Sequence, residues 1–366
     1  MTDSEILGFH RDLVATPSVS GSETVIADMI QDFLASCGIE VRRFHDNLWA
    51  VLGETGPLLC MNSHIDTVPP TSGWTLPPWS PTVRDGRVHG LGSNDAKASV
   101  AAMTAAFVRL HDAGWVTDGR LVLALVAAEE TGGAGAEILV PKMRRDGFAP
   151  DAAVIGEPTN LDVAIAQKGH LLLELVELGT ACHAAHGQAL GATNAVRLMA
   201  RDLCAMDGVN LGPEHPDLGP VTMEPTVVRG GTARNVIPDH ASCSLDVRTN
   251  PGGDHAQLIE RLRSCVKGEL NVLGAHLEPC GIDREHPLVK AALAARAGST
   301  AFGSRGVSDW VHFHGIPSIK VGPGRTERSH TPDEFVLESE ILDGARFYQE
   351  LAFGWSTGMC RQGRAP

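Results

Sequence analysis

Short apolar runs of this chain end on a histidine or an acid at several points, and this pattern limits the fold more than any other feature. Three such runs are 57–62, shortly before His64; 121–128, directly before Glu129; and 152–156, directly before Glu157. Helical patterns at 96–112 and 133–145 separate them, and this alternation predicts an α/β sheet. Because ligands of such sheets gather beyond the carboxyl ends of strands, we expect the three side chains to meet at one edge.

The pattern changes at about residue 170. From there the expected order is strand, helix, strand, strand, helix and strand, at 171–178, 192–206, 221–228, 241–248, 254–267 and 271–278. This βαββαβ order is typical of the split, ferredoxin-like α+β unit. The first style returns near 287 and closes with a helix at about 338–353. Since 366 residues exceed what one core usually supports, we predict a domain at 1–169 and 286–366 with a second domain, 170–285, inserted in it.

The sequence of the N-terminal region predicts two helices. The first residues have the pattern of an amphipathic, acid-containing helix start, unlike the basic and apolar segments of a signal peptide. Ser20 and Glu23 have the spacing of a capping box that opens a second helix, ending near Cys37 and Gly38.

Composition narrows the class of protein. With 43% hydrophobic residues the chain can build packed cores, and we find no apolar run of membrane-spanning length, so we expect a cytoplasmic globular protein. A net charge of −14 argues against a nucleic-acid surface, which needs clustered Lys and Arg. The eight cysteines show no CxxC pair, which favours reduced thiols over a disulfide framework or a cysteine metal site.

Histidines and carboxylates at strand ends are the ligand types of metallohydrolases. In an extended segment His64 and Asp66 point to the same side, so Asp66 can orient an imidazole that binds metal through its other nitrogen. Taken alone, a histidine and an aspartate at this spacing more often include an ordinary strand-end histidine than a metal ligand. Asp95 follows a glycine-containing turn and has two oxygens with which to bridge two metals; the alternative is a helix N-cap.

Two adjacent acids, Glu129 and Glu130, end a buried strand and would repel each other unless a cation compensates their charge. If Glu130 binds metal, Glu129 is free to act as the general base. The alternative is a solvated acidic loop. His330 lies in a polar turn and, taken alone, is typical of a surface histidine.

All these residues together fit one family. The segments that carry the likeness are MNSHIDTVPP (61–70), GLGSNDAKAS (90–99), AAEETGGAG (127–135), IGEPTN (155–160), RNVIPDHASCSLDVR (234–248) and GPGRTERSHTPDEF (322–335). They resemble the dizinc M20 metallopeptidases, and most closely the branch of acetylornithine deacetylase and succinyl-diaminopimelate desuccinylase. The resemblance implies a zinc-exopeptidase-like α/β catalytic domain with an inserted α+β domain that serves as a lid and dimerises.

The same resemblance implies roles for the residues of the catalytic domain. It implies two Zn²⁺ ions, for which Co²⁺ can substitute, with these ligands: His64 and Glu157 on one ion, Glu130 and His330 on the other, and Asp95 on both. Asp66 would orient a ligand and Glu129 would be the general base. Gly322 and Gly324 would form a backbone loop near the substrate carboxylate, although a tight turn after a strand explains them equally well.

For the inserted domain, the resemblance implies a histidine that stabilises the oxyanion in the active site of a neighbouring subunit, and hence a homodimer. His183 matches that position best, while His186 is the alternative because alanines replace the small polar residues usual after this histidine. Asn235 and Arg248 would contact the substrate, since a guanidinium can grip a carboxylate with two hydrogen bonds. Their alternatives are a turn-forming asparagine and a surface arginine.

The implied reaction is hydrolysis of the amide of a small N-acyl amino acid, with N-acetylornithine deacetylation in arginine biosynthesis as the first choice. N-succinylornithine or N-succinyl-diaminopimelate desuccinylation, and carboxypeptidase or aminoacylase activity, share the same metal positions. A succinyl group would require a cation, for which Arg229, Arg234 and Arg305 are candidates. An inactive relative acting as a binding protein would be expected to lack Glu129 or a metal ligand, and here every position is filled.

Overall fold

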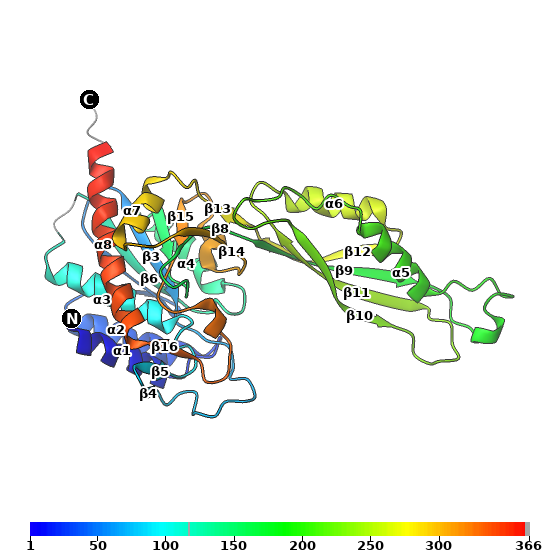
Figure 1. Cartoon of the computed structure of the whole chain (residues 1–366), viewed down its shortest axis with the longest axis horizontal. Helices are drawn as coiled ribbons and strands as arrows, with labels where there is room; N and C mark the ends of the chain where they lie inside the picture. The colour runs from blue at the N-terminus through cyan, green and yellow to red at the C-terminus, as the bar shows by residue number, and fades with distance from the viewer. Residues whose placement is uncertain (116–117, 363–366) are drawn as a thin grey trace. The chain divides into compact units, whose positions relative to one another are not determined.

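The structure is a computed structural model, and it describes residues 1–115 and 118–362. The chain divides into two compact units (Figure 1). Unit 1 comprises Met1–Ile165, Gly281–Phe302 and Ser308–Pro366, and unit 2 comprises Ala166–Cys280 and Gly303–Val307. The boundaries that the sequence predicts for independently folding domains, 169/170 and 285/286, stay a prediction.

A mixed sheet forms the centre of unit 1. Its strand order is β1-β2-β6-β3-β7-β15-β8-β13, and β14 also pairs with β8. The bounds are β1 (Arg42–Phe44), β2 (Asn47–Leu52), β3 (Leu58–His64), β6 (Arg120–Val126), β7 (Ala152–Ile155), β8 (Val163–Gln167), β13 (Cys280–Gly281), β14 (Ala301–Ser304) and β15 (Ser318–Lys320). Strands β6, β3, β7 and β15 are parallel to one another, and every residue of β3 is buried. A sheet buried on both faces is what an α/β fold requires.

Helices flank this sheet. They are α1 (Asp3–Ala15), α2 (Thr24–Ser36), α3 (Lys97–Asp112), α4 (Ala134–Arg145), α7 (Pro287–Ala295) and α8 (Glu338–Gln362). Helix α3 packs against α1 and α8, and its many alanines let these helices approach closely. A small sheet, β16-β5-β4, joins β4 (Thr82–Arg84), β5 (Arg87–His89) and β16 (Phe335–Leu337). The structure thus confirms the α/β catalytic fold.

The capping box predicted for α2 is wrong. Helix α2 begins at Thr24, its N-cap is Glu23, and no side chain caps it. Ser20 Oγ instead donates a hydrogen bond to Asp66 Oδ2 at 2.6 Å. A capping box does form at α1, between Thr2 and Glu5. The residues with Ser-x-x-Glu spacing therefore do not cap α2, and Ser20 bonds instead to a residue distant in the sequence.

Unit 2 has the predicted βαββαβ order. Its elements are β9 (Gly169–Leu178), η1 (Ala184–His186), α5 (Ala195–Met206), β10 (Thr222–Gly230), β11 (His240–Thr249), α6 (His255–Cys265) and β12 (Glu269–Leu277). The strands form an antiparallel sheet in the order β10-β11-β9-β12. Buried and half-buried residues alternate along β9, so Leu171, Leu173 and Leu175 lie on one face and pack under α5 and α6 (Figure 1). No helix in the described parts of the chain is long and apolar enough to cross a membrane.

Candidate active site

Parallel pairing of three strands brings the predicted site residues to one edge of the unit 1 sheet. In β3, His64 lies opposite Val126 of β6, and Asn62 lies opposite Ile155 of β7. The segments that follow β6 and β7 carry Glu129 and Glu157, so these side chains leave the sheet beside His64. The structure therefore places the three strand ends where the α/β pattern predicts them.

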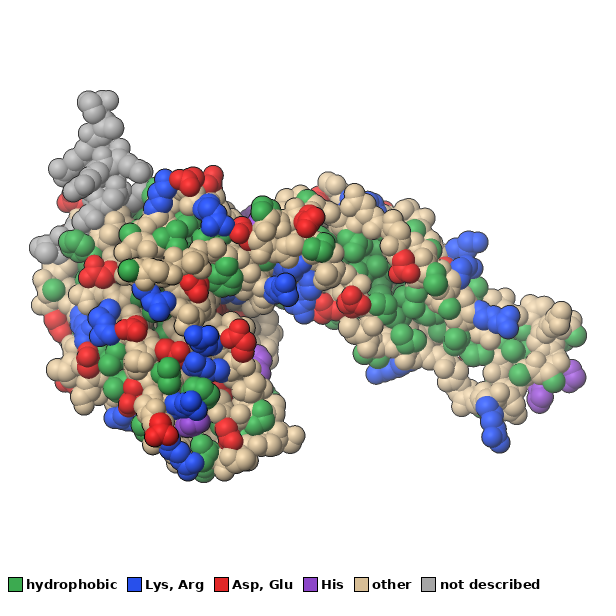
Figure 2. Space-filling model, in the orientation of Figure 1, with side chains coloured by type: hydrophobic (Ala, Val, Ile, Leu, Met, Phe, Trp, Pro, Cys, Tyr) green, Lys and Arg blue, Asp and Glu red, His purple; other side chains and the backbone are tan. Residues whose placement is uncertain are grey.

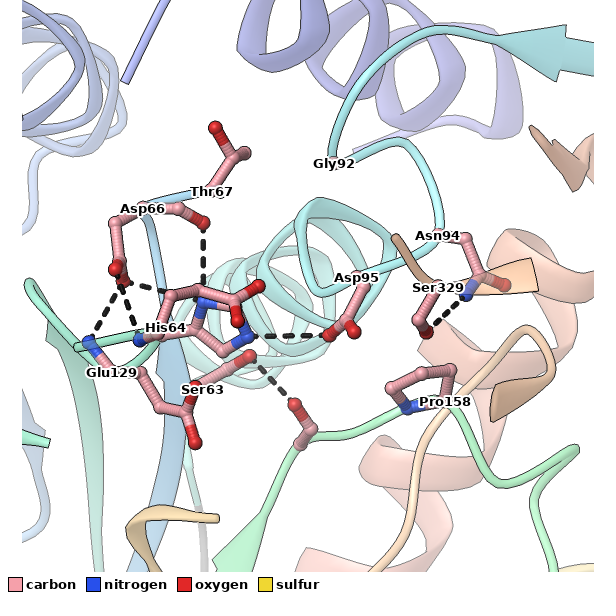
Figure 3. A network of polar contacts seen from close by, with 12 residues as sticks. Ser63, His64, Asp66, Thr67, Gly92, Asn94, Asp95, Glu129, Pro158 and Ser329 are labelled. Atoms are coloured by element: carbon pink, nitrogen blue, oxygen red, sulfur yellow. Dashed lines mark hydrogen bonds and ion pairs between the residues drawn. The ribbon is translucent and has the colours of Figure 1, made fainter. Parts of the chain in front are cut away.

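His64 lies between two carboxylates and is buried (Figure 3). Its Nδ1 is 3.1 Å from the backbone oxygen of Asp66 and 3.3 Å from Asp66 Oδ1, while its Nε2 is 3.3 Å from Asp95 Oδ1. Burial disfavours a charged ring, but the carboxylates of Asp66 and Asp95 outweigh it and raise the pKa of His64 well above its ordinary value. The site therefore favours a positive charge at Nε2, which a proton or a metal ion can supply.

Asp95 stands between the two predicted histidine ligands. Its Oδ1 faces His64 Nε2, and its Oδ2 is 3.6 Å from His330 Nε2, which in turn is 2.9 Å from Glu130 Oε1. Helix α3 begins at Lys97 without a side-chain cap, so Asp95 is not the N-cap of that helix. One oxygen toward each histidine is the arrangement a bridging carboxylate needs.

The donor atoms fall into two overlapping groups. His64, Asp95 and Glu130 form one group and His64, Glu129 and Glu157 the other, with ligand atoms within 4.8 Å of one another in each group. Burial, and then the charge of Asp95, raises the pKa of Glu157 to about 8. Burial, and then the charge of Glu157, raises the pKa of Glu129 well above its ordinary value. Such crowded, buried carboxylates call for cations, so the residues present fit a pair of divalent metals.

Glu334 supports the site and was not predicted from the sequence. Its carboxylate accepts hydrogen bonds from the backbone N–H groups of Gly92, Asn94 and Asp95, at 3.2, 2.8 and 3.0 Å. Burial raises its pKa to about 8. The carboxylate thereby fixes the loop that presents Asp95. The only sequence signal is an acid four residues after His330, within the same polar turn.

A second buried acid, Asp309, was also missed. It begins the 3₁₀ helix η2 (Asp309–Phe313), and its Oδ2 accepts a hydrogen bond from Asn62 Nδ2 at 3.1 Å. Burial raises the pKa of Asp309 to about 7. Asn62 lies two residues before His64 on the same face of β3, so this pair lies behind the histidine.

The two predicted glycines bring site loops together. A Cβ at Gly322 would lie 2.6 Å from the backbone oxygen of Glu157, and one at Gly324 would lie 2.3 Å from Asn94 Oδ1. Gly324 also has a φ of +84°, which favours glycine. Close packing thus requires glycine at both positions, and their contact with a substrate stays a prediction.

In unit 2, His183 and Asn235 lie together in neighbouring loops. The backbone oxygen of Asn235 accepts the Ala184 amide at 2.9 Å, and His183 Nδ1 accepts the Ala185 amide at 3.2 Å. The rings of His183 and His186 are 5.7 Å apart. The structure therefore brings one predicted substrate residue to the predicted oxyanion histidine.

Arg248 lies elsewhere in unit 2. Its guanidinium donates to Asp246 at 2.7 and 3.0 Å, and it lies at the Thr249 end of β11. The loops with His183 and Asn235 lie beyond the opposite, His240 end, where β11 pairs with the end of β9. A ten-residue strand spans roughly 30 Å, so Arg248 is far from His183 within one copy of unit 2.

A model of peptidase family M20/M25/M40 matches residues 60–353. A succinyl-diaminopimelate desuccinylase of Rhizorhabdus wittichii is 32% identical over 277 residues, which cover 71% of this chain and 72% of that protein. An acetylornithine deacetylase of Proteus mirabilis is 29% identical over 360 residues, or 89% of this chain and 90% of that one. An M20 metallo-carboxypeptidase from Sulfolobus solfataricus has the same fold, with a TM-score of 0.80 and 17% identity over 96% of this chain and 99% of that one.

Proposed function

Because this chain belongs to peptidase family M20/M25/M40, we propose that it hydrolyses the amide bond of an N-acyl amino acid at a two-metal centre built around Asp95. The observation that carries the proposal is the placement of Asp95, with one oxygen toward His64 and the other toward His330. Glu129 lies in the same group of donor atoms as His64 and Glu157, and we assign it to catalysis and not to the metals.

Each of the two proposed metal ions has one histidine among its ligands. His64 and Glu157 would hold one ion, Glu130 and His330 the other, and Asp95 both, with Zn²⁺ as the proposed metal and Co²⁺ as a substitute. When bound, two such ions supply Lewis-acid polarisation of the scissile carbonyl and lower the pKa of a water molecule. Asp66 receives the Nδ1 side of the His64 ring, which leaves Nε2 for the metal.

Glu129 is the proposed general base. Its backbone amide donates a hydrogen bond to Asp66 Oδ1 at 3.1 Å, and burial, followed by the charge of Glu157, raises its pKa well above the ordinary value, which makes the carboxylate a better proton acceptor. Glu129 takes a proton from the attacking water and returns it to the nitrogen of the departing amine. The adjacent Glu130 pairs with His330 and has no part in this transfer.

His183 is the proposed oxyanion donor. Since its Nδ1 accepts the Ala185 amide, the ring proton of the neutral histidine lies on Nε2, which can donate to a developing negative charge. This hydrogen bond favours His183 over His186 for the role. Asn235, in the adjacent loop, would contact the same substrate.

We propose that His183 acts in the active site of a second copy, in a homodimer formed through unit 2. The separation of His183 from Arg248 along β11 supports this, because one copy of unit 2 cannot present both side chains to one small substrate. Apolar side chains are exposed on the edge strands of the sheet, at Val227 and Val228 of β10 and Leu273 of β12. Figure 2 shows hydrophobic side chains gathered over these strands.

The proposed substrate is N-acetylornithine, which would place the enzyme in arginine biosynthesis in the cytoplasm. Arg248 would bind its α-carboxylate, and the loop of Gly322 and Gly324 would lie beside it. The similarity to a desuccinylase supports an N-succinyl amino acid as the second candidate.

Parallel assays test both candidates. The purified, zinc-loaded chain would be given N-acetylornithine, N-succinylornithine, N-acetylcitrulline and N-succinyl-diaminopimelate, with Glu129→Gln as the control. We expect hydrolysis of one substrate well above the others, and its loss in the variant. Absence of hydrolysis of all four by a protein that holds two metals would contradict the proposed substrate class.

A further inference from the structure

Four successive backbone amides in the turn after β6 each donate to a side-chain oxygen from a distant segment. The pairs are Ala127 with Asn47 Oδ1 at 2.9 Å, Ala128 with Glu23 Oε1 at 3.1 Å, Glu129 with Asp66 Oδ1 at 3.1 Å, and Glu130 with Asp66 Oδ2 at 3.2 Å. Backbone amides in turns usually bond to nearby backbone oxygens or water. This turn depends on side chains from three other places in the sequence.

The turn needs such support because it departs from regular structure. Strand β6 ends at Val126, so the amides that follow have no neighbouring strand to pair with. Ala128 has a φ of +59°, in the left-handed region that is unfavourable for a residue with a Cβ. The turn has backbone hydrogen bonds of its own, such as that from the Gly133 amide to the Ala128 oxygen at 3.0 Å, and the four external hydrogen bonds add to them in holding this unfavourable conformation.

The acceptors are buried, and two of them, Asn47 and Asp66, make a further hydrogen bond of their own. Glu23 and Asn47 are 3% and 2% exposed. Asn47 Nδ2 donates to the Phe44 oxygen at 3.1 Å, which directs its Oδ1 toward Ala127. Asp66, which Figure 3 shows beside His64 and the Glu129 amide, accepts a further hydrogen bond from Ser20 Oγ. Contacts within the protein thus hold Asn47 and Asp66 in place, and burial restricts Glu23.

We propose that Glu23 and Asn47 are positioning residues for the reaction, which hold the 127–130 turn so that Glu129 and Glu130 project in two fixed directions. This inference rests on the proposed function, in which Glu129 is the base and Glu130 a metal ligand. Neither Glu23 nor Asn47 touches the substrate in this scheme. Their effect passes through the backbone of the turn.

The chemistry of the acceptors suggests matched variants. Glu23→Gln keeps an oxygen that can accept the Ala128 amide, whereas Glu23→Leu fills a similar volume without an acceptor. At the second position, Asn47→Leu removes both the acceptor and the donor to the Phe44 oxygen, whereas Asn47→Asp keeps the acceptor and loses that donor. Thr2→Ala, which breaks the capping box of α1, serves as a control that weakens a helix without touching the turn.

The experiment compares kcat, KM, metal content and amide hydrogen exchange of peptides covering 121–133 in the full-length, zinc-loaded variants. For Glu23→Leu we expect kcat to fall about 10²-fold with little change in KM, since small misplacement of a catalytic group has effects of this size. Two metals should remain bound, and the turn amides should exchange faster. Glu23→Gln should recover most of kcat and of the exchange protection, and Thr2→Ala should leave both unchanged.

Two results would overturn the inference. One is unchanged kcat in Glu23→Leu and Asn47→Leu although the turn exchanges faster; the other is an equal loss in Glu23→Leu and Glu23→Gln that follows only the fraction of folded protein. If the wild type hydrolyses none of the tested substrates, the proposed function fails. In that case the exchange comparison still decides whether Glu23 and Asn47 hold the turn.

Discussion

The two units present their proposed functional residues in opposite ways. In unit 1 the proposed metal ligands and base lie at strand ends and in loops, and all are buried or half-buried except His330, whose side chain is 49% exposed. Asp66 and Glu334 accept hydrogen bonds from the backbone of the loops that carry Glu129, Glu130 and Asp95. In unit 2, His183 and Asn235 are exposed on loops at one end of a sheet. From this difference we expect unit 1 by itself to supply all the ligands of the proposed metal site. We expect His183 and Asn235 to act only when a substrate or another copy of the chain lies against them.

The largest effect should come from the base of unit 1. Glu129→Gln removes the proton acceptor and keeps the size of the side chain, so we expect kcat to fall about 10²–10⁴-fold. Metal content should stay at the wild-type level, because Glu130 and the backbone of the turn are unchanged. Steady-state kinetics with metal analysis of the same sample measures both. A variant that loses a metal in proportion to its activity would show that Glu129 is a ligand.

Removal of the proposed oxyanion donor should have the next largest effect. His183→Ala should lower kcat about 10²–10³-fold, the usual effect of losing one such donor. His186→Ala is the matched control, since its ring lies 5.7 Å from that of His183 and belongs to the short helix η1 that His183 caps. We expect it to retain nearly full activity in the same assay. The reverse ranking of the two variants would move the role to His186.

A smaller effect is expected from the loop that presents Asp95. Glu334→Ala leaves three backbone N–H groups without their acceptor, and loss of such outer-shell partners typically weakens metal binding about 10–100-fold. Competition with a chelator would measure the dissociation constant. An unchanged constant would show that the loop holds its shape without Glu334.

The smallest effect on activity is expected from the buried acid of unit 2. Asp202 accepts the amides of Lys267 and Gly268 at 2.6 and 2.8 Å, and its pKa is lowered because hydrogen bonds, first that from Arg201, outweigh the effect of burial. Asp202→Asn should therefore reduce the free energy of unfolding by about 1–3 kcal/mol at neutral pH, with kcat unchanged.

The pH dependence of this contribution follows from the sign of the shift. Because the folded pKa of Asp202 is lowered, its contribution is present above the unfolded value near 3.9 and is lost as the pH falls below it. Denaturant unfolding at pH 7 and at about pH 2.5, well below the unfolded value, would show the difference between wild type and Asp202→Asn shrinking. A difference that grows on acidification would contradict the assigned cause.

Much of the fold was predictable because its periodic signals are strong. The alternation along β9 and the βαββαβ order of unit 2 appear in the sequence as they do in the structure. Strands β4, β5, β8, β14 and β16 were not predicted. Each has only three to five residues, which is too short for a period-2 pattern to stand out from a loop.

The residues of the candidate site likewise fall into two groups, those that the sequence pattern indicates and those that it does not. Metal-ligand types at strand ends, such as His64 and Glu157, give a direct sequence signal. Glu23, Asn47 and Glu334 act by accepting backbone amides from remote segments, and no local pattern records such a partner. The spacing of Ser20 and Glu23 even favoured a helix cap, because the same residue types satisfy either a helix terminus or a distant turn.

The central proposal is that unit 1 of one copy and unit 2 of another together form an active site. It is tested most directly by mixing two inactive variants, Glu129→Gln and His183→Ala, under conditions that allow subunit exchange. In a mixed dimer one active site has an intact Glu129 facing the intact His183 of the other copy. We predict recovery to about a quarter of the wild-type rate, because about half of randomly assembled dimers are mixed and each has one complete site. A mixture no more active than its two components, with exchange verified, would contradict an active site that unit 1 of one copy completes with unit 2 of another.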